Sequence, residues 1–573
     1  MKRLPRPTAL LTALTLLGLA APPALAQASL EGRVIVRLKA DSPGVRAKAW
    51  RERAAAYEVQ DVAQRRADRL AQRAALPLLR AGRSLDARTH VVRVSGLDSA
   101  TLRQRLAQDP EVEFVVIDRI RRHSAVPNDA LYASGGTGQG QWYLKAPSSA
   151  VASAINAEGA WDLTVGSPSI AVAVLDTGVR YDHPDLAANL LPGYDLIGAG
   201  DNNGSIVLAV ANDGDLADAD ASDPGDWVSQ ADVDSRRLGS SCTSDDIGPS
   251  SWHGTHVAGL VAAAGNNGIG IAGTSWNSKI LPVRVLGKCG GYDSDIVAGI
   301  KWAVGAAVPG LPVNANPARV LNLSLGGVGP CTGDDGKLYT EAIALASTRG
   351  AVVVVAAGNS TGEPVDSPAN CPGALAVTGL RHIGTKVGFS SMGPEVAIGA
   401  PGGNCVNLQG ACLYPLLSTT NAGSQGPGLN GYSDSAAAVG TSFATPLVAG
   451  TVALMLARNP ALTPDEVRTL LRSTARPYPS TGSEASTQQC PAPKSGAEVL
   501  ECYCNTSTCG AGMLDARAAV AAVPLPPAPP PAPAPSPTPA PPPSSGGGGG
   551  GGTSGPWSLL GLVAALAALG RRR

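Results

Sequence analysis

The chain has 573 residues, and its 45 Lys and Arg balance its 45 Asp and Glu, so the formal net charge at pH 7 is zero. This length leaves room for more than one domain. A neutral chain with only 16% charged residues lacks the basic surface that nucleic acids require, so we expect no nucleic-acid partner.

Residues 1–26 predict a secretory signal peptide. Lys2, Arg3 and Arg6 form the positive start, residues 9–21 form the apolar core, and Ala24-Leu25-Ala26 forms a small-residue cleavage site. A membrane anchor is the alternative. The short apolar run and the cleavage box that follows it favour the signal peptide.

Residues 27–125 predict a small separate module. Apolar alternation indicates strands near 32–39, 89–94 and 113–117. Arg- and Ala-rich stretches between them, near 45–79 and 101–106, favour helices. Strands and helices in this alternation are typical of an α+β sandwich.

Three later stretches carry the residues of a nucleophile, a base and an orienting group. The wholly apolar run 170–175 predicts a buried parallel strand, and Asp176 follows it at the carboxyl edge where α/β proteins place their chemistry. His253 stands just before the apolar helix predicted at 257–264, and Ser442 stands at the start of another apolar helix. Asp, His and Ser so placed form the three parts of a catalytic triad. Ser442 alone would read as an ordinary helix N-cap.

Taken together over roughly residues 126–520, these motifs resemble the subtilisin-like serine peptidases, in which the triad runs in the order Asp, His, Ser. The resemblance implies a mainly parallel α/β sheet flanked by helices, with a catalytic domain over residues 126–523. It makes Ser442 the nucleophile, His253 the general base and Asp176 the group that orients the imidazole.

The resemblance also implies where a substrate binds. An extended peptide would add itself as a strand between two edges, formed by Ser324, Leu325 and Gly326 on one side and by Gly290 and Gly291 on the other. Asn359 resembles the amide that donates to the oxyanion together with the backbone N–H of Ser442. Outside this context, Gly358-Asn359 after a strand would read as a turn.

Asp366 lies, by the family's layout, near the primary specificity pocket. A carboxylate in the wall of that pocket would favour Lys or Arg before the cleaved bond. The alternative is a carboxylate that points into solvent.

Calcium is the expected cofactor, and no organic cofactor is expected. The resemblance places one ion at Asp185 and Asn267, with Asp129 as an additional ligand, because calcium prefers hard oxygen donors. A second acidic loop also has the spacing of a calcium cradle, although a solvated acidic loop explains it equally well. Its candidate ligands are Asp213, Asp215, Asp218, Asp220 and Asp226.

The ten cysteines all lie from Cys242 onward, and their even number favours disulfides formed in an oxidising compartment. Zinc is disfavoured, because a single residue separates Cys502 from Cys504 and no partner pair stands at finger spacing. The resemblance and the positions favour the pairs Cys242–Cys289 and Cys331–Cys371. Cys405–Cys412 and Cys504–Cys509 would close short loops, which leaves Cys490 for Cys502.

The composition changes after residue 523. Residues 524–556 form a Pro/Ala-rich and then Gly-rich linker, and residues 557–573 combine Trp557, an apolar run and three terminal arginines. This arrangement resembles the GlyGly C-terminal sorting signal of Gram-negative bacteria, which the intramembrane protease rhombosortase is thought to cut. A simple C-terminal transmembrane anchor is the alternative, although the apolar run is shorter than a full span requires.

The sequence as a whole predicts a monomeric serine endopeptidase that is secreted or carried to the surface of a Gram-negative cell by export and sorting machinery. By its position, the module 27–125 resembles an inhibitory prosegment that is cut away near residues 122–127. A permanent N-terminal domain is the alternative. Two other functions stay open for the same fold, a catalytically silent surface binding protein and an esterase.

Overall fold

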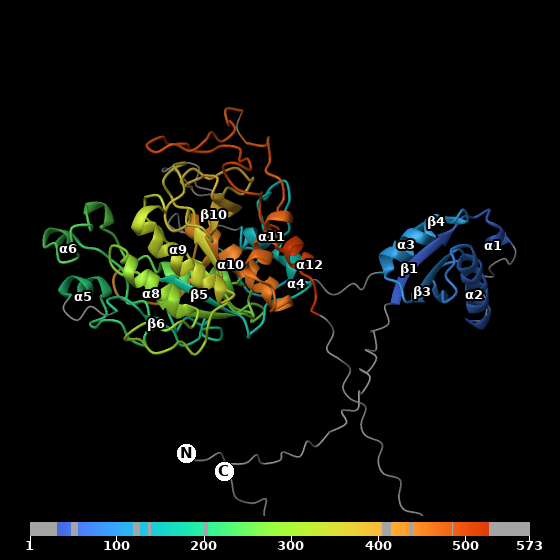
Figure 1. Cartoon of the computed structure of the whole chain (residues 1–573), viewed down its shortest axis with the longest axis horizontal. Coiled ribbons are helices and arrows are strands. Elements are labelled where there is room, and N and C mark those ends of the chain that lie inside the picture. Colours follow the sequence, from blue (N-terminus) through green and yellow to red (C-terminus); the bar gives the residue numbers. More distant parts are fainter. Residues whose placement is uncertain are drawn as a thin grey trace, which may run out of the picture. The chain divides into compact units, whose positions relative to one another are not determined.

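The computed structural model describes residues 31–46, 56–118, 126–135, 139–199, 204–403, 414–434, 439–483 and 485–526. They form two compact parts, residues 31–118 and 126–526, and each is described by itself (Figure 1). The predicted signal peptide and the C-terminal segment lie outside the described residues, as does all of the predicted linker beyond residue 526.

The first part is a four-stranded antiparallel sheet in the order β2-β3-β1-β4. Val34 and Val36 of β1 pack against Leu70 of α2 and Leu102 of α3, so one face of the sheet is covered by helices. The predicted α+β arrangement is confirmed. Its elements are β1 (Glu31–Leu38), α1 (Pro43–Arg46), α2 (Ala56–Arg73), β2 (Arg80–Ser84), β3 (Thr89–Ser95), α3 (Ser99–Leu106) and β4 (Val112–Ile117).

The second part is built on a seven-stranded parallel sheet in the order β11-β10-β9-β8-β5-β7-β6. Along β5, Val172 and Val174 face one hydrophobic core while Ala173 and Leu175 face the other, so the strand is apolar on both sides as predicted. The strands are β5 (Ala171–Asp176), β6 (Tyr194–Asp195), β7 (Lys279–Arg284), β8 (Val320–Leu323), β9 (Val352–Ala356), β10 (Leu375–Leu380) and β11 (Val396–Pro401).

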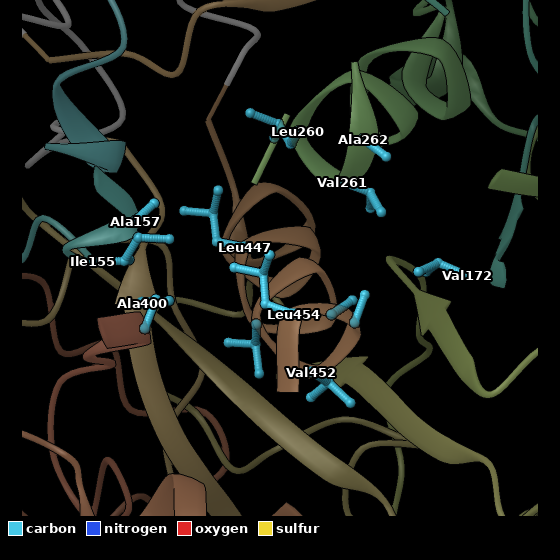
Figure 2. Packing of buried hydrophobic residues seen from close by; sticks show 14 of the residues in the cluster. Ile155, Ala157, Val172, Leu260, Val261, Ala262, Ala400, Leu447, Val452 and Leu454 are labelled. Atoms are coloured by element: carbon cyan, nitrogen blue, oxygen red, sulfur yellow. The ribbon is translucent and has the colours of Figure 1, made fainter. Parts of the chain in front are cut away.

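Helices cover both faces of this sheet (Figure 1). Helices α8 and α9 pack on one face, and α7 and α10 on the other. Figure 2 shows Leu447, Val452 and Leu454 of α10 among side chains from several surrounding elements. The helices are α4 (Ala157–Trp161), α5 (Ser205–Ala211), α6 (Gln230–Asp234), α7 (His253–Ala262), α8 (Asp293–Ala303), α9 (Gly333–Thr348), α10 (Thr441–Arg458), α11 (Pro464–Ser473) and α12 (Ala516–Ala522).

Helix α10 is long and apolar enough to cross a membrane, but 83% of that stretch is buried inside the domain. It is therefore the core helix of this part. Residues 557–573, for which the sequence favours a sorting signal with a transmembrane anchor as the alternative, lie outside the described residues. A parallel sheet with helices on both faces confirms the predicted α/β fold class.

A two-stranded ribbon of β12 (Ser418–Asn421) and β13 (Asn430–Ser433) completes the domain.

Four disulfides join described cysteines, and two of them connect distant segments. Cys405 and Cys412 lie outside the described residues. The observed pairs are Cys242–Cys289, Cys331–Cys371, Cys490–Cys502 and Cys504–Cys509, which are the pairs expected for those eight residues.

Candidate active site

Three elements meet where the candidate triad lies. Strand β5 ends at Asp176, helix α7 begins at His253, and Ser442 is the second residue of α10. The residue before α7, Trp252, has φ 53°, and its buried indole N–H donates to the Gly423 carbonyl at 2.7 Å. This anchored turn fixes the point at which α7 begins, and with it the position of His253.

Asp176 and His253 are in direct contact. The imidazole Nδ1 of His253 lies 2.7 Å from Oδ1 of the fully buried Asp176, and the same oxygen accepts the Thr177 N–H at 2.8 Å. Burial alone would lower the pKa of His253, but the charge and hydrogen bond of Asp176 outweigh it, helped by Asp226 and Asp223, and raise that pKa above its ordinary value. The carboxylate therefore both orients the ring and favours the imidazolium.

The hydroxyl of Ser442 lies in the same cleft as His253. In the free protein this hydroxyl donates to the Ser324 carbonyl at 3.2 Å. Phe443, the next residue, packs its ring against His253 with centroids 5.3 Å apart. The Ser442 hydroxyl must therefore leave the Ser324 carbonyl before it can donate to His253.

Two N–H donors flank Gly440, beside the start of α10. The point at which a Cβ would stand on Gly440 is 3.6 Å from both the Asn359 amide nitrogen Nδ2 and the backbone nitrogen of Ser442. The amide oxygen of Asn359 accepts from the Thr441 N–H and hydroxyl, both at 3.0 Å, which turns Nδ2 toward the cleft. The Ser442 N–H belongs to the first helical turn, whose donors have no intrahelical acceptor. This pair can stabilise negative charge that develops on a carbonyl oxygen.

A cleft of about 890 Å³ holds these groups together with the predicted substrate edges. The backbones of Gly327 and Ser367 pair across one wall, with N···O distances of 2.9 and 3.0 Å. Glycine-rich walls leave open backbone edges, which suits an extended peptide. The predicted substrate residues in its lining are Ser324, Leu325, Gly326, Gly290, Gly291 and Asp366.

Sequence reasoning missed the residues that support His253 from behind. Thr177 donates its hydroxyl to the buried Asp223 at 2.7 Å and accepts the Gly254 N–H at 3.0 Å. Burial, with the nearby charge of Asp226, raises the pKa of Asp223 to about 7. Asp226 itself accepts from the N–H and hydroxyl of Ser251, both at 2.6 Å, and lies in the cleft lining. In the sequence, the only sign of this support is the pair Thr177-Gly178, which directly follows Asp176.

The first predicted calcium site brings its donors together. Asp129 accepts the N–H groups of Asn266 and Asn267, at 2.7 and 3.1 Å, while Asp185 accepts the Asn267 amide at 2.7 Å and the Ile271 N–H at 2.8 Å. Burial raises the pKa of both carboxyls, and the charge of Asp129 adds to the rise at Asp185. Among the described residues, neither carboxylate forms an ion pair with Lys or Arg. Two buried carboxylates with no cationic partner among the described residues suit a cation that prefers oxygen ligands, such as calcium. Their oxygens accept N–H groups here, and the Asn267 oxygen accepts the Ile269 N–H at 2.9 Å, so Asn267 would have to turn its amide to become a ligand.

The second predicted calcium site does not fit. Asp213 pairs with the buried Arg284, which also binds Asp195, and Asp226 holds Ser251. Oxygens of Asp218 and Asp220 are engaged by backbone N–H groups two residues further on, and Asp215 is exposed. In the part of the chain that the structure describes, no three of these carboxylates bring their oxygens within 4.8 Å of one another.

A parallel α/β sheet that holds His253 and Ser442 in one cleft, with the buried Asp176 in contact with His253, is typical of the subtilisin-like class. The chain belongs to the subtilase family, because residues 167–496, more than half of its length, match the model of that family.

Individual relatives agree with this assignment. An extracellular protease of Xanthomonas campestris pv. campestris is 39% identical over 447 residues, which cover 78% of this chain and 64% of that protein. An extracellular basic protease of Dichelobacter nodosus is 38% identical over 65% of this chain and 56% of its own length. The chain thus spans less than two thirds of these two relatives. A solved protease structure from Pseudoalteromonas arctica PAMC 21717 is 41% identical, with a TM-score of 0.55, and covers 69% of this chain and 99% of its own.

Proposed function

We propose that the protein is a serine endopeptidase that hydrolyses peptide bonds of proteins through Ser442, His253 and Asp176. The observation that carries the proposal is the 2.7 Å contact between His253 and Asp176 in the cleft that also holds the Ser442 hydroxyl. The N–H donors of Asn359 and Ser442 that flank Gly440 support it.

In the first half of the reaction, the Ser442 oxygen attacks the peptide carbonyl carbon, and Nε2 of His253 takes the hydroxyl proton. Nδ1–H stays bound to Asp176, which stabilises the imidazolium. The carbonyl oxygen becomes an oxyanion that accepts from Asn359 and the Ser442 N–H. The imidazolium then gives its proton to the leaving amine, and an acyl-enzyme remains.

In the second half, a water molecule repeats these steps in the place of the amine. His253 removes a proton from the water, whose oxygen attacks the acyl carbon. Collapse of the second tetrahedral species returns the proton to Ser442 and releases the new carboxyl end of the substrate.

The names of relatives support a secreted protease. The Xanthomonas and Dichelobacter proteins are both named extracellular proteases. Export of this chain through residues 1–26, and sorting or anchoring through residues 557–573 at the surface of a Gram-negative cell, are part of the proposal. Hydrolysis of casein by the mature protein, compared with hydrolysis of a short-chain ester, tests the reaction class. Ester cleavage without casein cleavage would contradict an endopeptidase.

The module 27–125 is proposed to act as an inhibitory prosegment. On β4, Phe114 and Val116 are 40% and 45% exposed, so the face of the sheet opposite the helices presents apolar side chains. Such a surface suits docking onto a second protein surface, and the catalytic domain of the same chain is the proposed partner.

The pH dependence of kcat/KM is expected to reveal the effect of the Asp226 charge on the pKa of His253. His253 must be neutral to accept a proton, so activity rises with pH through its raised pKa. Asp226→Asn removes one of the negative charges that favour the imidazolium, lowers this pKa and moves the rising limb to lower pH. In this variant, Asp176 and Asp223 still raise the pKa of His253. The buried His256 does not contribute to the rising limb, because burial lowers its pKa to about 4 and its imidazole stays neutral.

Asp293→Asn is the matched control for this profile. Asp293 also lies in the cleft lining but is not among the charges that act on His253. The control should leave the limb in place. A limb that stays fixed in the Asp226 variant as well, or moves equally in both, would contradict the role of Asp226.

Calcium is proposed to bind at Asp129, Asp185 and Asn267. When bound, the ion supplies positive charge to the two carboxylates and ties the N-terminal segment of the domain to the loop 265–270. Removing it with EDTA is expected to lower the unfolding temperature of the mature protein by about 5 °C or more, because a ligand that binds only the folded state stabilises it.

Two variants locate the calcium effect. Asp185→Asn should lower the unfolding temperature and abolish the response to EDTA, because it removes a buried ligand. Asp218→Asn, in the acidic loop, should leave the response intact. A lost response in the Asp218 variant, or no response in the unaltered protein, would refute the proposed site.

A further inference from the structure

Asp366 lies in the wall of the substrate cleft, next to the residues of the oxyanion pair. Its side chain is nearly buried, with 7% of the residue exposed, and its backbone N–H donates to the carbonyl of Ala357, the residue that follows β9. The Cβ position of Gly326, on the predicted substrate edge, is 2.9 Å from the Ser367 carbonyl and 3.7 Å from Cβ of Asp366. Asp366 therefore lies directly behind the strand against which a peptide would pair.

The absence of a side chain at Gly358 leaves room for the carboxylate of Asp366. A Cβ on Gly358 would stand 1.9 Å from Oδ2 of Asp366, so any other residue there would displace the carboxylate. Gly358 has φ 107°, a conformation that other residues rarely adopt. The residue before Asn359 thus leaves room for a negative group beside the oxyanion pair.

The carboxylate has no cationic partner in the described structure. The Ser360 hydroxyl donates to it at 3.3 Å, and no ion pair among the described residues includes it. Burial raises its pKa, and Glu363 adds to the rise, which reflects the cost of a negative charge held away from water. The cleft lining also contains Asp226 and Asp293 but no Lys or Arg among the described residues. A positively charged side chain is the group that this cleft lacks.

We propose that Asp366 selects Lys or Arg at the residue before the cleaved bond, so that the substrates are basic segments of proteins. This inference rests on the proposed endopeptidase function. The side chain of that residue would enter beside Gly326 and Gly358, and its cationic head would meet the Asp366 carboxylate.

The chain itself contains such a segment. Arg121 and Arg122 stand between the N-terminal module and the catalytic domain, and their structure lies outside the described residues. Hydrolysis of the bond between Arg122 and His123 would add the elements of one water molecule, OH to the Arg122 carbonyl carbon and H to the His123 nitrogen. The same preference would then release the N-terminal module.

Matched peptide p-nitroanilides that differ only in Lys, Arg or Leu before the anilide test the preference. The mature wild-type protein is expected to cleave the Lys and Arg peptides with at least tenfold higher kcat/KM than the Leu peptide. Asp366→Asn should reduce kcat/KM for the basic peptides by about 30-fold or more, the size of effect expected when one partner of a buried charged pair is lost. Its kcat/KM for the Leu peptide should change less than threefold.

Asp293→Asn is the matched control, because it removes the same charge from the same cleft. It should retain the preference for Lys and Arg. Equal losses in the two variants, or a wild-type protein that cleaves the Leu peptide best, overturn the proposal even if casein is digested. The wild-type comparison does not depend on any variant folding. Failure to cleave casein and every peptide would instead reject the endopeptidase function itself.

The N-terminus of the mature protein provides a second test. Mass spectrometry is expected to find His123 as its first residue, and Arg121→Gln combined with Arg122→Gln should slow its appearance at least tenfold. Arg103→Gln with Arg105→Gln, two exposed charges on α3, is the matched control and should process normally. A mature N-terminus that does not follow Lys or Arg, or equal processing of both double variants, contradicts cleavage at this junction.

Discussion

Ser442→Ala is expected to lower kcat for casein by about 10⁶-fold, the scale of loss known for the nucleophile of such triads. No other described hydroxyl combines a place in the cleft with position two of a buried helix beside the Asn359 amide. Without it no acyl-enzyme can form, and only binding and the oxyanion donors remain to help water attack. The measurement is the rate of casein digestion by purified variant and wild type at equal concentration.

The same substitution should leave the fold unchanged. The Ser442 hydroxyl makes one 3.2 Å hydrogen bond, to the Ser324 carbonyl, so its loss costs little stability. Thr451→Val is the matched control on the same helix. Its buried hydroxyl bonds only to the Leu447 carbonyl, and that variant should digest casein at nearly the wild-type rate. Casein digestion that survives in the Ser442 variant would refute the mechanism.

The elements that carry the triad could be predicted from the sequence because each is apolar on every side. A short continuous apolar run such as 170–175 favours a strand covered by helices on both faces, and the longer run after Ser442 favours a buried helix. The position of a polar residue at the end of such an element is then fixed by the element. Asp176, His253 and Ser442 all stand at such ends.

The partners of the acidic loop that contains Asp213 and Asp226 could not be predicted in this way. Its spacing suggests calcium, but the partner of Asp213 is Arg284, 71 residues further on, and that of Asp226 is Ser251. Long-range partners of exposed loops follow from the tertiary structure and leave no local pattern. Strand β2 was missed for a similar reason, since its sequence RAGRS has no apolar alternation and it pairs only at the sheet edge.

Asp366 lies between these two cases. Its place near the specificity pocket followed from the family resemblance, but its orientation depends on the missing side chain of Gly358 and on the paired backbones of Gly327 and Ser367. Backbone geometry of this kind decides whether a carboxylate faces solvent or substrate. A sequence alone leaves both alternatives open.

Asp176→Asn is expected to lower kcat by about 10⁴-fold. The amide can be placed in two ways, and both impair catalysis. With its oxygen in the place of Oδ1, it still accepts from His253 and Thr177, but the imidazolium formed during attack loses its counter-charge. With its NH₂ group there, the imidazole is held in the tautomer whose Nε2 already carries a proton and cannot accept one from Ser442.

Asp223→Asn is the matched control for Asp176→Asn, because Asp223 is an equally buried carboxylate that binds Thr177 but does not touch the imidazole. Burial and the charge of Asp226 raise its pKa to about 7, so it favours the imidazolium less than an ordinary carboxylate would, and its replacement should lower kcat less than tenfold. The residual activity of the Asp176 variant should also rise at lower pH than in the wild type, because the largest charge favouring the imidazolium is gone. Equal losses in the two variants would mean that burial of negative charge, and not contact with His253, is what the reaction requires.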